Sequence, residues 1–186
     1  KFSSSKKFKD CFWLTCPLSR KSYNQNLNKV IIANDFFKKH ISFFKMRHGK
    51  TVEKRLLQEV IQIYEKYSEK NNLNICDMNI DFIQLICNHL EISTKFAKSS
   101  TLNNLENFKK QDKVIEIVKK LDGDTYISGL GARNYQSDQD FKSENIELRY
   151  LDFTIPKEYK INNENLSMLD IMLHEGIWKT KKIILH

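Results

Sequence analysis

Apolar side chains repeat at helical spacing in the first half of the chain and predict three helices there. Over residues 36–47 they recur every three or four positions, and comparable stripes run over residues 56–67 and 78–90. Either Asn74 or Asp77 can supply the N-terminal cap of the third helix. Each stripe leaves a polar face for solvent, which is typical of helices packed on one side of a core.

Short β-rich runs precede these helices and alternate with helical stripes in the second half. The predicted strands are residues 11–18, 28–34, 93–99, 125–128 and 146–153. The further predicted helices are residues 110–121, 137–144 and 165–176. In the last helix, Ser167 and Asp170 have the spacing of a capping box, and Gly176 occupies the position of a C-cap glycine.

A strand, a helix and a strand in this order imply parallel strands joined by a right-handed crossover. The expected fold class is therefore α/β, with a largely parallel sheet flanked by helices in Rossmann-like layers. With 186 residues, 40% of them hydrophobic, the chain is long enough to bury one core, and we expect a single domain over residues 1–186.

The net charge of +8 raises the question of a nucleic-acid partner. Lysines are interleaved with acidic residues, as in "KTVEKRLLQEV", which is typical of solvated helix faces, and no nucleic-acid motif is present. We therefore expect a small anionic ligand and no nucleic acid. No apolar run approaches the roughly 20 residues of a membrane span, so a cytoplasmic protein without a membrane span is expected.

Cysteine and histidine positions predict neither a metal site nor a cofactor. The four cysteines form no CxxC pair, and they are expected to be reduced and packed in the core. Cys16 lies near a strand end, yet no paired histidine identifies it as a nucleophile. The histidines, including His48 and His174, share no ligand spacing, and "HEGIW" differs from a zinc-protease motif, so they are interpreted as ordinary helix residues.

The segment "DGDTYISGLGARNYQ" concentrates three of the five glycines within nine residues. If Gly129 and Gly131 adopt positive φ, their amide groups can form a concave nest for an anion. Arg133 could add a bidentate fork for phosphate or carboxylate, and hydroxyls come from Ser99, Ser100 and Ser128. The alternative is that the glycines only turn the chain. As a dinucleotide fingerprint "GLGARN" fails, because it lacks the third glycine.

Asp152 lies at the end of the strand predicted over residues 146–153 and has Tyr150 beside it. It could orient a sugar hydroxyl or act as a base, and a role in a cap or turn is the alternative.

The order of motifs along nearly the whole chain resembles the WbqC-like family. The resemblance is carried by "CFWLTCPLSRKSYNQNLNKVII", "FFKKHISFFKMRHGKT", "ICDMNIDFIQLICNHLEISTKFAKSS", "DTYISGLGARNYQSDQDFKSENIELRYLDF" and "NLSMLDIMLHEG". Relative to that family, Leu130 replaces a small residue or proline, and the family's opening strand and aromatic loop are absent before Lys1, so we expect an N-terminally incomplete domain.

This resemblance implies a role in bacterial surface polysaccharide biosynthesis, including O-antigen and other lipopolysaccharide. The implied chemistry is transfer of an amino-acid or acyl group to an amino sugar or nucleotide-sugar, and the alternative is a non-catalytic binding or scaffold protein of a polysaccharide assembly. The implied catalytic residues are Asp152 and Tyr135. The implied ligand-binding residues are Arg20, Lys21, Tyr23, Asn24, Ser99, Ser100, Ser128, Gly129, Gly131, Arg133 and Asn134.

Overall fold

The structure is a computed structural model, and it forms two compact units. It describes residues 2–3, 11–19, 25–33, 36–70, 73–154, 156–157, 160–161 and 164–185. Unit 1 comprises Lys1–Thr94 and Ile155–His186, and unit 2 comprises Lys95–Thr154. The expectation of one domain stays a prediction.

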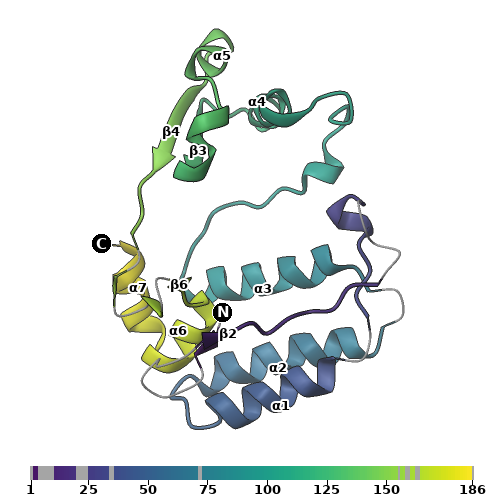
Figure 1. Ribbon diagram of the computed structural model, residues 1–186, viewed down its shortest axis with the longest axis vertical. Coiled ribbons are helices and arrows are strands. Elements are labelled where there is room, and N and C mark those ends of the chain that lie inside the picture. Colours follow the sequence, from purple (N-terminus) through teal and green to yellow (C-terminus); the bar gives the residue numbers. More distant parts are fainter. Residues whose placement is uncertain are drawn as a thin grey trace. The chain divides into compact units, whose positions relative to one another are not determined.

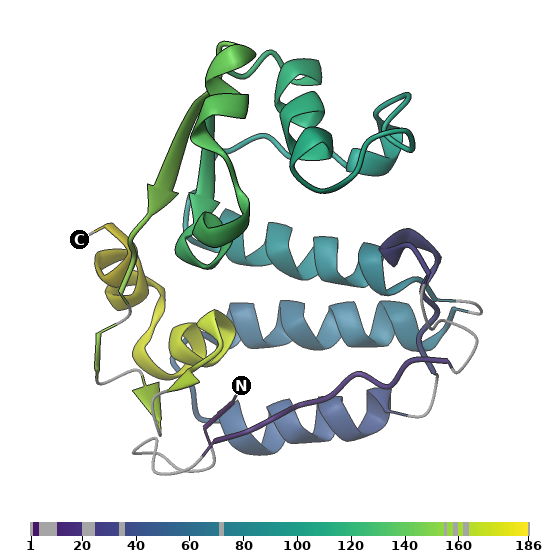
Figure 2. The same cartoon turned by 45° about the horizontal axis from the view of Figure 1, so that its top comes forward.

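Three helices form the main layer of unit 1, as the apolar stripes predict. They are α1 (Phe37–His48), α2 (Lys54–Ser68) and α3 (Ile75–His89). They lie side by side with α2 in the middle (Figures 1 and 2). Helix α2 turns five apolar and aromatic side chains to the core, from Leu56 to Tyr67, where they pack against Phe37 and Phe44 of α1.

Asn74 is the cap of α3, which settles the choice between Asn74 and Asp77. The Asn74 side-chain oxygen accepts a hydrogen bond from the backbone N–H of Cys76 at 2.7 Å. This bond satisfies one of the amide groups that the first turn of a helix leaves without a partner.

Two further helices, α6 (Met168–Glu175) and α7 (Ile177–Leu185), complete the helical part of unit 1. Between them lies Gly176 with φ 89° and ψ 155°, a backbone conformation that is almost restricted to glycine, so the predicted C-cap glycine is confirmed. Ser167 precedes α6 without capping it through its side chain, and Asp170 in the first turn of α6 is fully buried.

The strands described in unit 1 are short antiparallel pairs. They are β1 (Phe2–Ser3) with β2 (Cys11–Phe12), and β5 (Lys160–Ile161) with β6 (Glu164–Asn165). Of the strand predicted over 11–18, only the two residues of β2 form a strand. Leu18 forms an isolated β-bridge with Ile32. The short 3-10 helix η2 (Leu27–Lys29) takes the place of the start of the strand predicted over 28–34.

Unit 2 contains the parallel strands that place the chain in the α/β class. Its elements are η3 (Ser99–Thr101), α4 (Lys110–Lys120), β3 (Thr125–Gly129), η4 (Leu130–Tyr135), α5 (Asp138–Ser143) and β4 (Glu147–Leu151). Strands β3 and β4 pair in parallel, and α5 lies in the connection between them (Figure 1). The α/β class is confirmed, with a parallel sheet of two strands flanked by helices.

The two faces of the β3–β4 pair differ in burial. Ser128 and Leu148 are buried, whereas Ile127 and Leu151 are 63% and 60% exposed. This alternation follows from the two-residue period of a strand. The buried face packs on Phe141 of α5 and on apolar side chains of α4, which together form the core of unit 2.

No helix in the described ranges is long and apolar enough to cross a membrane.

Candidate functional site

The carboxyl ends of β3 and β4 bring together the largest group of the predicted site residues. In the parallel register Ser128 pairs with Tyr150 and Gly129 with Leu151, so both strands end at the same edge. The η4 turn follows β3 directly and contacts both strands, and Asp152 follows β4. The residues from Ser128 to Tyr135 therefore share this edge with Asp152, and the carboxyl edge of parallel strands is where ligands of open α/β sheets usually bind.

Arg133 is held over strand β4 at this edge. Its guanidinium carbon lies 5.6 Å from the centroid of the Tyr150 ring, within the range of a cation–π contact. Arg133, Asn134, Tyr135 and Asp152 are all exposed, so their polar groups are open to a ligand. Ser128 is the exception, since it is only 4% exposed.

The expected glycine nest is wrong, because neither Gly129 nor Gly131 has a positive φ. Gly129 has φ −75° and ψ 148°, and Gly131 lies within the 3-10 helix η4. Of the five glycines, all of which the structure describes, only Gly176 has a positive φ. The residues from Leu130 to Tyr135 thus form a 3-10 helix in place of the expected concave backbone nest, and Arg133 is the basic residue of this turn.

Ser99 and Ser100 do not lie at this edge, because the strand predicted over 93–99 does not form. Residues 92–98 have no regular secondary structure, and the two serines lie in the exposed turn η3. In Figures 1 and 2 the segment from η3 to α4 lies on the side of α4 away from β3. The predicted residues Arg20, Lys21, Tyr23 and Asn24 lie outside the described residues.

Cys16 is not an activated nucleophile. Burial raises the pKa of its thiol to about 11, which keeps the sulfur protonated at neutral pH. This agrees with its interpretation as a packing residue.

A second polar group, in unit 1, joins the end of α1 to α6. His48 is the last residue of α1, and Asp170 and His174 lie one turn apart on α6. The Nε2 atom of His48 is 3.3 Å from Oδ1 of Asp170, and that of His174 is 3.7 Å from the same oxygen. The side chains of His48 and Asp170 are fully buried, and that of His174 is 17% exposed.

This group is the one set of three or more potential metal ligands found among the described residues, with one ligand atom from each residue within 4.8 Å of the others. Burial lowers the pKa of His174, and Arg47 reinforces the shift while the Asp170 carboxylate opposes it. Spacing along the chain did not reveal the group, because His48 belongs to a distant helix. The available signal was Asp170, a carboxylate inside the apolar run "LSMLDIMLHEG".

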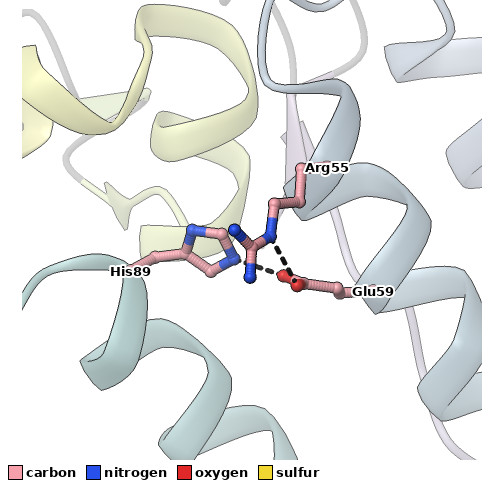
Figure 3. A network of polar contacts seen from close by, with 3 residues as sticks. All are labelled: Arg55, Glu59 and His89. Carbon is pink, nitrogen blue, oxygen red and sulfur yellow. Dashed lines mark hydrogen bonds and ion pairs between the residues drawn. The ribbon is translucent and has the colours of Figure 1, made fainter.

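A third polar group lies on the surface between α2 and α3. Glu59 accepts a hydrogen bond from Nε of Arg55 at 3.0 Å and contacts the His89 ring nitrogen through its other oxygen (Figure 3). These three side chains line a hollow of about 310 Å³. Burial disfavours ionisation of Glu59, but the His89 and Arg55 contacts outweigh it and lower the pKa of Glu59.

We expect this lowered pKa to make acid more destabilising for the wild type than for Glu59→Gln. The carboxylate contributes stability above its unfolded pKa and loses it as pH falls through the lower folded pKa. Urea unfolding at pH 6 and pH 4 should show a difference below about 1 kcal/mol, because the group is partly exposed. Glu65→Gln, an exposed position on the same helix, should keep the wild-type pH dependence; equal slopes in all three proteins would contradict the expectation.

Comparison with known proteins gives two similarities. A family model described as the WbqC-like protein family matches residues 5–182. The chain is also 22% identical over 170 residues to the uncharacterized protein Rv1507c of Mycobacterium tuberculosis (strain ATCC 25618 / H37Rv), covering 88% of this chain and 72% of that protein. No solved structure matches. Since the family model spans nearly all of its residues, the chain belongs to the WbqC-like protein family.

Proposed function

We propose that this WbqC-like protein acts in the cytoplasm in the biosynthesis of bacterial surface polysaccharide, as a transferase that moves an amino-acid or acyl group to an amino sugar or nucleotide-sugar. The family match supports the context. The observation that carries the site is the shared carboxyl edge of β3 and β4, where Arg133 and Asp152 follow neighbouring parallel strands.

The exposed side chains at this edge are suited to binding the donor and to deprotonating the acceptor amine in such a reaction. Arg133 supplies a permanent positive charge with a fork of donors, which suits a diphosphate or carboxylate. Asp152 is one residue beyond the Gly129–Leu151 pair and can accept a proton from the attacking sugar amine. As nitrogen bonds to the acyl carbon, the bond from that carbon to the donor's leaving group breaks. Tyr135 and Asn134 offer hydrogen bonds to sugar hydroxyls.

One observation favours the second candidate, a non-catalytic binding or scaffold protein. Four large apolar side chains near the same edge are exposed: Ile127 by 63%, Leu130 by 45%, Leu151 by 60% and Phe153 by 43%. Exposed apolar side chains that gather in one region are typical of protein–protein contact surfaces. A scaffold would bind its partner there and show no turnover with an amino sugar and an activated acyl donor.

We expect nucleotide-sugars to raise the thermal unfolding temperature of the full chain, and Arg133→Ala to abolish the rise. Loss of a charged donor to a phosphate weakens binding by about 1.5–3 kcal/mol, which corresponds to a loss in affinity on the order of tenfold to a hundredfold. The measurement is a titration with a panel of uridine and deoxythymidine diphosphate sugars, followed by calorimetry of any that bind.

The matched control is Arg149→Ala, which removes an exposed arginine of β4 whose guanidinium is bound by Glu147 at 2.7 Å. It should leave the ligand response unchanged. An equal loss in both variants, or a full response in Arg133→Ala, would remove Arg133 from the site. Binding that depends on Arg133 but without product, followed by mass spectrometry with an activated acyl donor, would favour the scaffold.

A further inference from the structure

We propose that His48, Asp170 and His174 bind a divalent transition-metal ion of the zinc type, which links α1 to α6. Two imidazoles and one carboxylate form a donor set that zinc uses when three protein ligands leave one position open. This inference concerns unit 1 and is independent of the proposed transferase site in unit 2.

The distances between the three side chains are suitable for coordination of one shared ion. Ligand atoms at about 2.0–2.2 Å from zinc in a tetrahedron lie roughly 3.3–3.6 Å from one another. The two histidine-to-aspartate distances, 3.3 Å and 3.7 Å, are close to this separation. All three ligand atoms lie within 4.8 Å of one another, so shortening the longest of these separations would complete the set.

His48 is the independent indication of a ligand. Its side chain is fully buried, and neither ring nitrogen has a hydrogen-bond partner in the described part of the chain. A buried polar group without a partner is costly and uncommon in folded proteins. Its Nε2 points to within 3.3 Å of Asp170 Oδ1, and an ion coordinated by both atoms would satisfy this one of the two ring nitrogens.

The surrounding contacts hold the two helices in place for such a site. The Thr51 hydroxyl donates to the carbonyl of Leu173 at 2.5 Å, and the backbone N–H of Ile177 donates to the Glu53 carboxylate at 2.9 Å. The chain directly after α1 is therefore fixed to both ends of the segment that carries His174. Supporting bonds of this kind keep metal ligands oriented before the ion arrives.

The local charge is compatible with one divalent cation. Asp170 supplies a buried negative charge, and the Glu175 carboxylate also acts on His174, whereas Arg47 contributes an opposing positive charge. The group found among the described residues contains no cysteine, so the site offers nitrogen and oxygen donors only. His174, partly exposed, provides the side from which the ion can enter.

The test uses the purified full chain, stripped with a chelator and titrated with Zn²⁺ against a chromophoric competitor. We expect one tightly bound Zn²⁺ per chain and a rise in the thermal unfolding temperature on its addition, because an ion that binds only the folded state stabilises it. His174→Gln should weaken Zn²⁺ binding by at least about tenfold while the apo protein stays folded by circular dichroism. Asp170→Asn and His48→Gln should do the same if they fold.

His89→Gln is the matched control, since His89 lies on α3 and contacts Glu59 instead. It should retain the Zn²⁺ affinity of the wild type. Substituted Co²⁺ should give the visible bands of a nitrogen–oxygen site without a thiolate charge-transfer band. No tight Zn²⁺ in the wild type, unchanged affinity in His174→Gln, or a Co²⁺–thiolate band would each overturn the proposal.

Discussion

Replacing Phe44 by alanine is expected to lower the free energy of unfolding of unit 1 by about 3–5 kcal/mol. The Phe44 ring is fully buried and touches three other rings, with centroid distances of 5.3 Å to Phe43, 5.8 Å to His48 and 5.6 Å to Tyr64. Its loss leaves a cavity that these aromatic neighbours cannot close. Urea unfolding followed by tryptophan fluorescence and circular dichroism measures the change.

Because Phe44 packs against His48, the same substitution should also loosen the proposed zinc ligand. We expect a weaker Zn²⁺ affinity in Phe44→Ala under conditions in which the variant is still folded. Met46→Ala is the control on the same helix, since Met46 is 83% exposed, and it should change stability by no more than about 0.5 kcal/mol. A similar cost for both variants would show that the Phe44 ring is not a core element of unit 1.

Replacing Phe141 by alanine is expected to unfold unit 2 while unit 1 keeps its structure. Phe141 is fully buried, stacks on Tyr126 at 5.6 Å with an interplanar angle of 2°, and is the largest of the five buried residues in that core. Truncation costs about 3–5 kcal/mol. A core this small gives the unit a low free energy of unfolding. The cost of the substitution is therefore close to the entire free energy of unfolding of unit 2.

Hydrogen exchange measured by mass spectrometry should show lost protection over residues 110–151 and retained protection over residues 54–68. The response to nucleotide-sugars should disappear with unit 2, whereas Zn²⁺ binding should persist, because its ligands belong to unit 1. Phe96→Ala, at a side chain 52% exposed, should leave exchange unchanged. Uniform loss of protection in both units would show that they unfold together.

The helices were the most predictable part of the fold. The stripe over 36–47 became α1 and that over 110–121 became α4, with ends within one residue, because burial on one helix face leaves a periodic record in the sequence. Leu121, the last residue of the latter predicted helix, is the C-terminal cap of α4 and is 50% exposed.

Strands were less predictable, because a strand needs a neighbour as well as a suitable composition. The "STKFAKS" run was predicted to be a strand, yet it is exposed throughout and pairs with no described strand. By contrast, the strands predicted over 125–128 and 146–153 pair with each other and were found at almost the predicted positions.

Helix α7 was missed because Gly176 was interpreted as the end of the helical region. The glycine does end α6, but Ile177 then starts a new helix, and its amide is bound by the Glu53 carboxylate from another part of the chain. Contacts between residues distant in sequence were also not predictable for the candidate sites. Residues near one another in sequence, from Ser128 to Tyr135, were found together, whereas His48 and His174 meet only through tertiary packing.

The division of unit 1 into two stretches of sequence has a consequence for its synthesis on the ribosome. Residues 95–154 are contiguous and are synthesised before the segment that carries α6. Unit 2 can therefore fold before the last helices of unit 1 have been synthesised. Until Asp170 emerges, the imidazole of His48 stays open to water and to chaperones. In nascent chains stalled before Asp170 is synthesised, the face of α1 that packs against α6 should therefore be exposed to solvent.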